Sequence, residues 1–73
     1  MKLILFRREH CGLCELAEQM LVEVGVSAER CYLEDDIGHE ERYGWRIPVI
    51  RRADTDTELD WPFDAWKLRS FLE

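Results

Sequence analysis

Long apolar runs and an excess of positive charge are both missing from this sequence of 73 residues. Its longest uninterrupted apolar segments span a few residues, far short of the ~20 that a membrane-spanning helix requires. The segment 2–6 is also too short for the core of a signal peptide. Sixteen acidic residues outnumber ten basic ones, and the formal net charge of −6 argues against a nucleic-acid partner. We therefore expect a cytoplasmic protein that contacts neither membranes nor nucleic acids.

The small size of the chain limits what it can build. We expect residues 1–73 to form a single domain and to exist as a monomer. A domain this small buries only ~60% of its unfolded surface, which leaves no room for a separate substrate domain or a deep pocket. A content of 47% hydrophobic and 36% charged residues is typical of a folded globular protein.

Strand and helix patterns alternate along the chain. Short segments at residues 3–6, 30–33, 49–51 and 57–59 predict four strands. Three helices are predicted: residues 13–24 ending at Gly25, residues 37–43 ending at Gly44, and a last helix capped by Asp64. The order βαβ-α-ββα predicts an α/β fold with a four-stranded mixed sheet flanked by helices. A stripe at steps of three and four predicts the buried face of the first helix: Leu13, Leu16, Ala17, Met20, Leu21 and Val24.

Cys11 and Cys14 form a CxxC motif between the first predicted strand and the first predicted helix. The start of a helix presents unpaired N–H groups and about half a positive charge, and both stabilise a thiolate. We therefore expect Cys11 to be the nucleophile, with Cys14 one turn further on and close enough to attack a mixed disulfide at Cys11. A strand–CxxC–helix order within a βαβ unit is typical of thioredoxin-like redox proteins.

Two other interpretations of the cysteine pair stay open. The thiols could be inert and buried, or they could form half of a zinc site. Structural zinc needs four ligands, and the remaining candidates are Cys31, His10 and His39. There is no second CxxC motif, and Cys31 lies in a predicted strand, where packing is its simplest role. We therefore predict no metal site.

The surroundings of the pair are mixed in charge. Arg7 and Arg8 favour a thiolate at Cys11, whereas Glu9 and Glu15 oppose it.

Further along the chain, two aromatic residues that end the second predicted helix are placed to pack beneath the loop with Pro48: Tyr43 and Trp45.

Three blocks of the sequence are distinctive: Cys11-Gly12-Leu13-Cys14, Arg46-Ile47-Pro48-Val49 and Trp61-Pro62-Phe63-Asp64. They resemble the glutaredoxin-like branch of the thioredoxin superfamily, in particular a group of small bacterial glutaredoxin-like proteins. With the element order, the resemblance covers essentially the whole chain. It implies a thioredoxin-like fold and a thiol–disulfide oxidoreductase with Cys11 as nucleophile and Cys14 as resolving thiol. It also implies that Pro48 holds the cis-proline position facing the pair, and that the backbone of Ile47 pairs with a bound substrate strand.

The resemblance makes a disulfide-containing protein or glutathione the expected partner, with no cofactor. Arg8 would stand for the family's usual basic residue near the nucleophile, and Asp64 would receive the amine of glutathione. Two departures matter: Gly12-Leu13 stands where Pro-Tyr or a similar pair is usual, and Asp60-Trp61 replaces the Gly-Gly that lies against glutathione. Two alternatives therefore stay open: a non-catalytic module that binds a partner protein, and a glutaredoxin-like protein that binds a metal or an iron–sulfur cluster.

Overall fold

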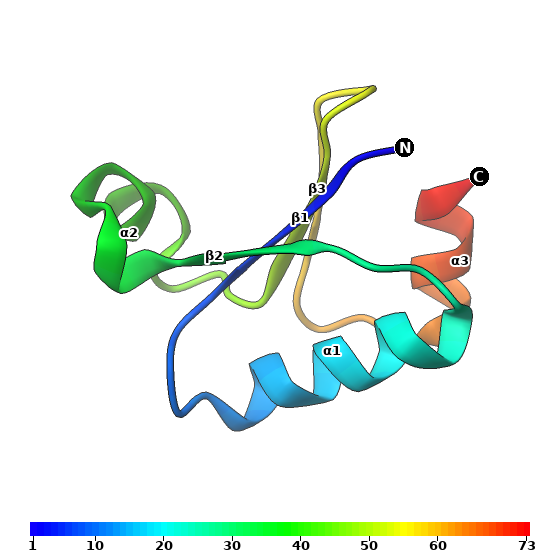
Figure 1. Cartoon of the computed structure of the whole chain (residues 1–73), viewed down its shortest axis with the longest axis horizontal. Helices are drawn as coiled ribbons and strands as arrows, with labels where there is room; N and C mark the ends of the chain where they lie inside the picture. Colours follow the sequence, from blue (N-terminus) through cyan, green and yellow to red (C-terminus); the bar gives the residue numbers. More distant parts are fainter.

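The computed structural model describes all residues 1–73, which form one four-stranded sheet and three α-helices (Figure 1). The strands are β1 (Leu3–Arg7), β2 (Glu29–Tyr32), β3 (Val49–Arg52) and β4 (Thr57–Asp60). They lie in the order β2-β1-β3-β4, with β2 parallel to β1 and the other neighbours antiparallel. The mixed sheet confirms the α/β architecture predicted from the sequence.

The helices are α1 (Gly12–Val24), α2 (Ile37–Tyr43) and α3 (Ala65–Leu72), and a 3-10 turn, η1 (Leu33–Asp35), follows β2. Side-chain caps fix where two of them begin, because the first N–H groups of a helix have no partner within it. The Asp36 carboxylate accepts from two N–H groups of α2, and the Asp64 carboxylate accepts from the Lys67 N–H at 2.8 Å. None of the three helices has the length and apolar composition needed to cross a membrane.

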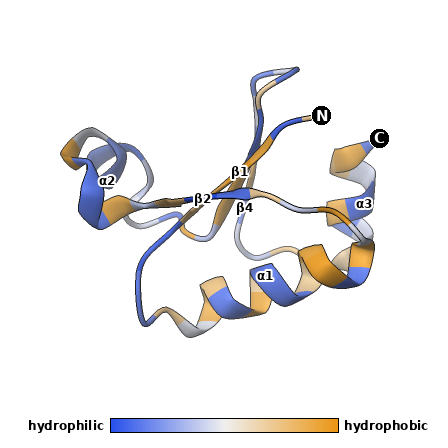
Figure 2. Ribbon diagram, in the orientation of Figure 1, coloured by the Kyte–Doolittle hydropathy of each residue, from blue (hydrophilic) through white to orange (hydrophobic).

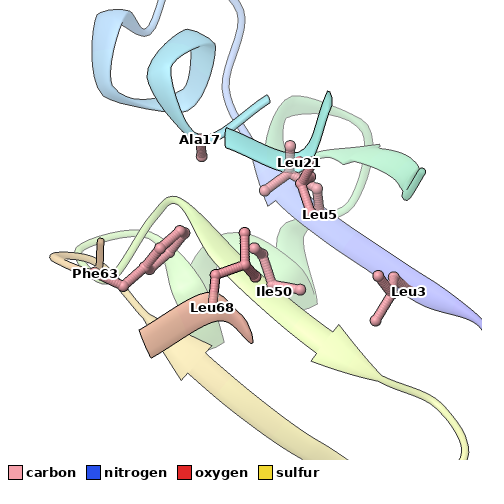
Figure 3. Close-up of a cluster of buried hydrophobic side chains, with 7 residues drawn as sticks. All are labelled: Leu3, Leu5, Ala17, Leu21, Ile50, Phe63 and Leu68. Carbon is pink, nitrogen blue, oxygen red and sulfur yellow. The ribbon is translucent and has the colours of Figure 1, made fainter. Parts of the chain in front are cut away.

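The two faces of the sheet bury separate sets of side chains. Successive residues of a strand point to opposite faces, so Leu3 and Leu5 face α1 and α3, whereas Phe6 faces α2. Figure 3 shows side chains of β1, α1, β3 and α3 converging on the first face. Figure 2 shows hydrophobic colour on β1 and on the second half of α1. The larger cluster contains Leu3, Leu5, Ala17, Leu21, Ile50, Phe63 and Leu68; the smaller contains Phe6, Leu33, Tyr43 and Val49.

Four sequence-based details are wrong. Leu13 and Leu16 are each 47% exposed, because only a narrow side of α1 touches the sheet. Trp45 is 87% exposed and does not pack beneath the Pro48 loop, although Tyr43 is buried as expected. The second strand is Glu29–Tyr32, one residue earlier than predicted, since Leu33 already belongs to η1.

The two glycines that end helices do so in different ways. Gly25 has φ 88°, the left-handed conformation that favours glycine, and its N–H donates to the Leu21 and Val22 carbonyls. Gly44 ends α2 as predicted, but with φ −52° it is not left-handed. Its position instead brings the chain close to the Arg8 guanidinium, which a Cβ there would meet at 3.2 Å.

Candidate functional site

Cys11 is the N-cap residue of α1. Its Sγ accepts a hydrogen bond from the Cys14 N–H at 3.2 Å, and its carbonyl accepts from the Glu15 N–H at 3.1 Å. The residue is part-exposed to solvent. An N–H donor and the positive end of a 13-residue helix both favour the anionic form of this sulfur.

Cys14 lies one turn further along α1 and is fully buried. Burial raises the pKa of its thiol to about 12, and the hydrogen bond and charge of Cys11 act in the same direction. A backbone hydrogen bond from Arg8 and the guanidinium charge of Arg7 oppose this rise. The two thiols therefore differ in kind: one is accessible at a helix start, and the other is a buried, neutral S–H at pH 7.

The raised pKa of Cys14 predicts a loss of stability in alkaline solution. The thiol ionises near 9.0 in the unfolded chain but near 12 in the folded one, so the folded state binds more protons between these values. The contribution of Cys14 to the free energy of unfolding is present below pH 9 and is lost as the pH rises toward 12. We expect the free energy of unfolding of the reduced protein, measured in urea from neutral to alkaline pH, to fall more steeply with pH than that of the Cys14→Ala variant. Parallel pH profiles of the two proteins would contradict this assignment.

Arg7 supplies a cation beneath the pair. It follows Leu3 and Leu5 in the alternation of β1 and so points toward α1, where its side chain is only 4% exposed. The guanidinium donates to Glu15 at 2.9 Å and to Glu18 at 2.7 Å. Sequence reasoning treated Arg7 as a local charge and missed its burial, although a charged residue in the inward register of a buried strand was the available signal.

Arg8, predicted to take part in substrate binding, is already bound within the chain. Its guanidinium donates to both carboxylate oxygens of Glu40, one of them at 2.7 Å, and to the Gly44 carbonyl at 3.1 Å. Arg8 thus joins the end of β1 to α2, and it remains within Coulombic reach of Cys11. Glu40 was not predicted as part of the site, since 32 residues separate it from Arg8.

Ile47 and Pro48 lie at the same end of the sheet as Cys11. Val49 pairs with Phe6 across the antiparallel β1 and β3, so the start of β3 stands beside the end of β1 and the loop that leads to Cys11. The Ile47–Pro48 peptide bond is cis, Pro48 is buried and Ile47 is part-exposed. No hydrogen bond within the chain uses the backbone N–H or carbonyl of Ile47, whereas the Pro48 carbonyl accepts from the Trp61 N–H at 3.1 Å.

Asp60, the last residue of β4, and Trp61 lie next to the Pro48 loop. Asp60 stands opposite Val49 and accepts from Arg46 at 2.7 and 2.9 Å, and these bonds are the first cause that raises the pKa of Arg46. Trp61 packs edge-on against Phe63, with ring centres 5.0 Å apart. Asp64, a predicted binding residue, uses its carboxylate as the cap of α3.

The third cysteine lies apart from the pair. Cys31 packs against the cluster on the α2 face of the sheet, and its sulfur lies 3.4 Å from Nδ1 of His39. Burial is the first cause that raises the pKa of the Cys31 thiol, followed by Asp36, Asp35 and Glu29. No group of three or more His, Cys, Asp or Glu side chains lies close enough together to hold a metal ion.

Comparison with known proteins identifies a family and several similar solved structures. Residues 2–73 match the glutaredoxin-like domain family (DUF836). The crystal structure of XcR50 from X. campestris is 39% identical, with a TM-score of 0.89 over 96% of this chain and 93% of that one. The solution structure of XcR50 is 40% identical, with a TM-score of 0.84 over 99% and 92% of the two chains.

A more distant structural neighbour, a mutant of the thioredoxin-like protein BC3987, is 18% identical. Its TM-score is 0.72 over 99% of this chain and 100% of the other, which shows a shared fold. No curated protein sequence matches the chain.

Proposed function

Since the chain belongs to the glutaredoxin-like domain family (DUF836), we propose that it is a thiol–disulfide oxidoreductase that works through Cys11 and Cys14. The observation that carries this proposal is the pairing of an accessible sulfur at the start of α1 with a buried thiol one turn away. The Cys14 N–H donates to the Cys11 sulfur at 3.2 Å, which stabilises the thiolate that disulfide exchange requires.

In the first step, the Cys11 thiolate attacks one sulfur of a substrate disulfide. A bond forms between Cys11 and that sulfur, the substrate S–S bond breaks, and the other substrate sulfur leaves as a thiolate that takes a proton from water. Ile47 supports this step, because its free backbone N–H and carbonyl can pair with an extended substrate segment beside the Pro48 loop.

In the second step, Cys14 resolves the mixed disulfide. Burial is the first cause that raises the pKa of Cys14, and the charge of Cys11 adds to it; the contribution of that charge disappears once Cys11 is bonded to substrate. The Arg8 backbone and Arg7 still favour the Cys14 thiolate. The Cys14 sulfur then bonds to Cys11 as the bond between Cys11 and the substrate breaks, and the Cys14 proton passes through water to the substrate sulfur that leaves. Two electrons have passed to the substrate, and an external dithiol must return them to the protein.

The test is to oxidise the protein in dithiothreitol buffers of graded potential and to measure its mass. We expect wild type to lose two hydrogens, with Cys11 and Cys14 joined and Cys31 still open to alkylation. In the Cys14→Ser variant a disulfide substrate should instead accumulate as an adduct on Cys11, because no resolving thiol is present. The Cys31→Ser variant serves as the control and should oxidise like wild type.

Two results would count against the proposal. If Cys11 formed neither an internal disulfide nor an adduct, the protein would not act as an oxidoreductase. If such a protein still bound a partner chain, the alternative of a non-catalytic thioredoxin-fold module would replace it.

A further inference from the structure

Both arginines near Cys11 are paired with carboxylates. Arg7 is buried, with its side chain 4% exposed, and pairs with Glu15 and Glu18. The Arg8 side chain is 36% exposed and pairs with Glu40, which is 39% exposed. The carboxylate side chain of Glu15 is 60% exposed. Because these carboxylates outnumber the two arginines, a substrate that approaches Cys11 meets a net negative charge.

Two further carboxylates border the loop that leads to Cys11. Glu9 is exposed, and its backbone N–H donates to Glu34 Oε2 at 2.9 Å. That hydrogen bond is the first cause that lowers the pKa of Glu34, so this exposed side chain keeps its negative charge. Glu34 thus holds a negative charge against the backbone only two residues before the sulfur.

The same pairing recurs beside Ile47, where the substrate backbone would pair. Arg46 is 20% exposed and donates to Glu58, which is 18% exposed, and to Asp60, which is 46% exposed. Each of the three arginines next to Ile47 or Cys11 pairs with a carboxylate of the chain: Arg7, Arg8 and Arg46. The free backbone of Ile47 favours an extended polypeptide, and the outward carboxylates favour a positively charged one.

We propose that the preferred substrate is a disulfide in a polypeptide segment that carries lysine or arginine beside its cysteine, and that small anionic disulfides are disfavoured. This inference rests on the proposed oxidoreductase function. The buried Arg7 and the helix start favour the thiolate, and the exposed carboxylates attract a basic substrate. Exposed charges act over a Debye length of ~10 Å at 0.1 M salt, which spans the residues next to a substrate cysteine.

The test compares two symmetric peptide dimers, each joined by one disulfide and identical except for lysine or glutamate beside the cysteine. The reduced protein is mixed with each peptide, and released peptide thiol is followed by chromatography. At about 20 mM salt we expect the lysine dimer to react at least about tenfold faster, and the ratio to fall toward one at about 0.5 M salt. Oxidised glutathione, a small anionic disulfide, should react as slowly as the glutamate dimer.

A matched pair of variants locates the effect. Glu9→Gln with Glu34→Gln keeps an acceptor for the Glu9 N–H but removes two charges, and we expect it to lower the lysine-to-glutamate ratio several-fold. Glu23→Gln removes an exposed charge near the far end of α1 and should leave the ratio unchanged. Equal rates for both dimers, or rapid reaction with glutathione, would overturn charge selection and leave the oxidoreductase proposal intact. No reaction at Cys11 with any disulfide would overturn both.

Discussion

The Cys11→Ser variant is expected to lose disulfide reductase activity by at least about 10³-fold, because a serine hydroxyl stays protonated where a thiol ionises. The N–H of Cys14 would still have an acceptor in the serine oxygen, so the start of α1 and the fold should be retained. The measurement is the rate of thiol release from a peptide disulfide under constant supply of dithiothreitol, with the uncatalysed rate subtracted.

The matched control for this prediction is Cys31→Ser. Cys31 lies on the α2 face of the sheet, hydrogen-bonded to His39 and away from Cys14, so its loss should leave the rate within about twofold of wild type. If Cys11→Ser kept a tenth or more of the wild-type rate, or if Cys31→Ser lost activity to the same degree, Cys11 would not be the nucleophile.

The largest effect on stability is expected from Leu21→Ala. Leu21 is 4% exposed and belongs to the larger core cluster, which it forms with side chains of β1, β3 and α3 (Figure 3). Truncation of a buried leucine to alanine costs about 2–5 kcal/mol, because it removes apolar contacts and leaves a cavity. Small domains have only about 5–15 kcal/mol of stability in total, so a substantial part of it should be lost.

Leu16→Ala is the control on the same helix. Leu16 has the same side chain and lies on the same predicted stripe, but it is 47% exposed in the structure. We expect its truncation to cost less than about 1 kcal/mol, because a half-exposed leucine has much less apolar surface to lose. Urea unfolding should give a lower midpoint for Leu21→Ala with the slope unchanged. Equal losses in the two variants would mean that α1 packs on the sheet through a different side.

The unequal environments of the two cysteines assign them different roles in the proposed reaction. Cys11 can be reached by substrate, whereas Cys14 is covered by the core and can be reached only by a sulfur already bonded beside it. A buried thiol with a pKa raised to about 12 is a poor nucleophile for passing disulfides. In the proposed reaction Cys11 therefore attacks and Cys14 resolves.

Much of this protein could be predicted from its sequence, because many of its features depend on residues close together in the chain. The position of Cys11 at a helix start follows from residues within one turn of it, as do the caps at Asp36 and Asp64 and the left-handed Gly25. The strand and helix order also follows from short patterns, and it was enough to predict the mixed four-stranded sheet. Such features depend on neighbours within about four residues, and these neighbours stay close in any arrangement of the chain.

Only the tertiary structure decided which charges lie inside and which side of α1 is covered. The pairing of Arg8 with Glu40 joins residues 32 positions apart, and the contact of Asp60 and Trp61 with the Pro48 loop depends on the register of β4 against β3. Leu16 and Leu21 share one stripe in the sequence, yet the side of α1 that is buried in the structure includes Leu21 and leaves Leu16 half-exposed. Contacts of this kind are set by sheet order and strand register, which no local pattern of residues specifies.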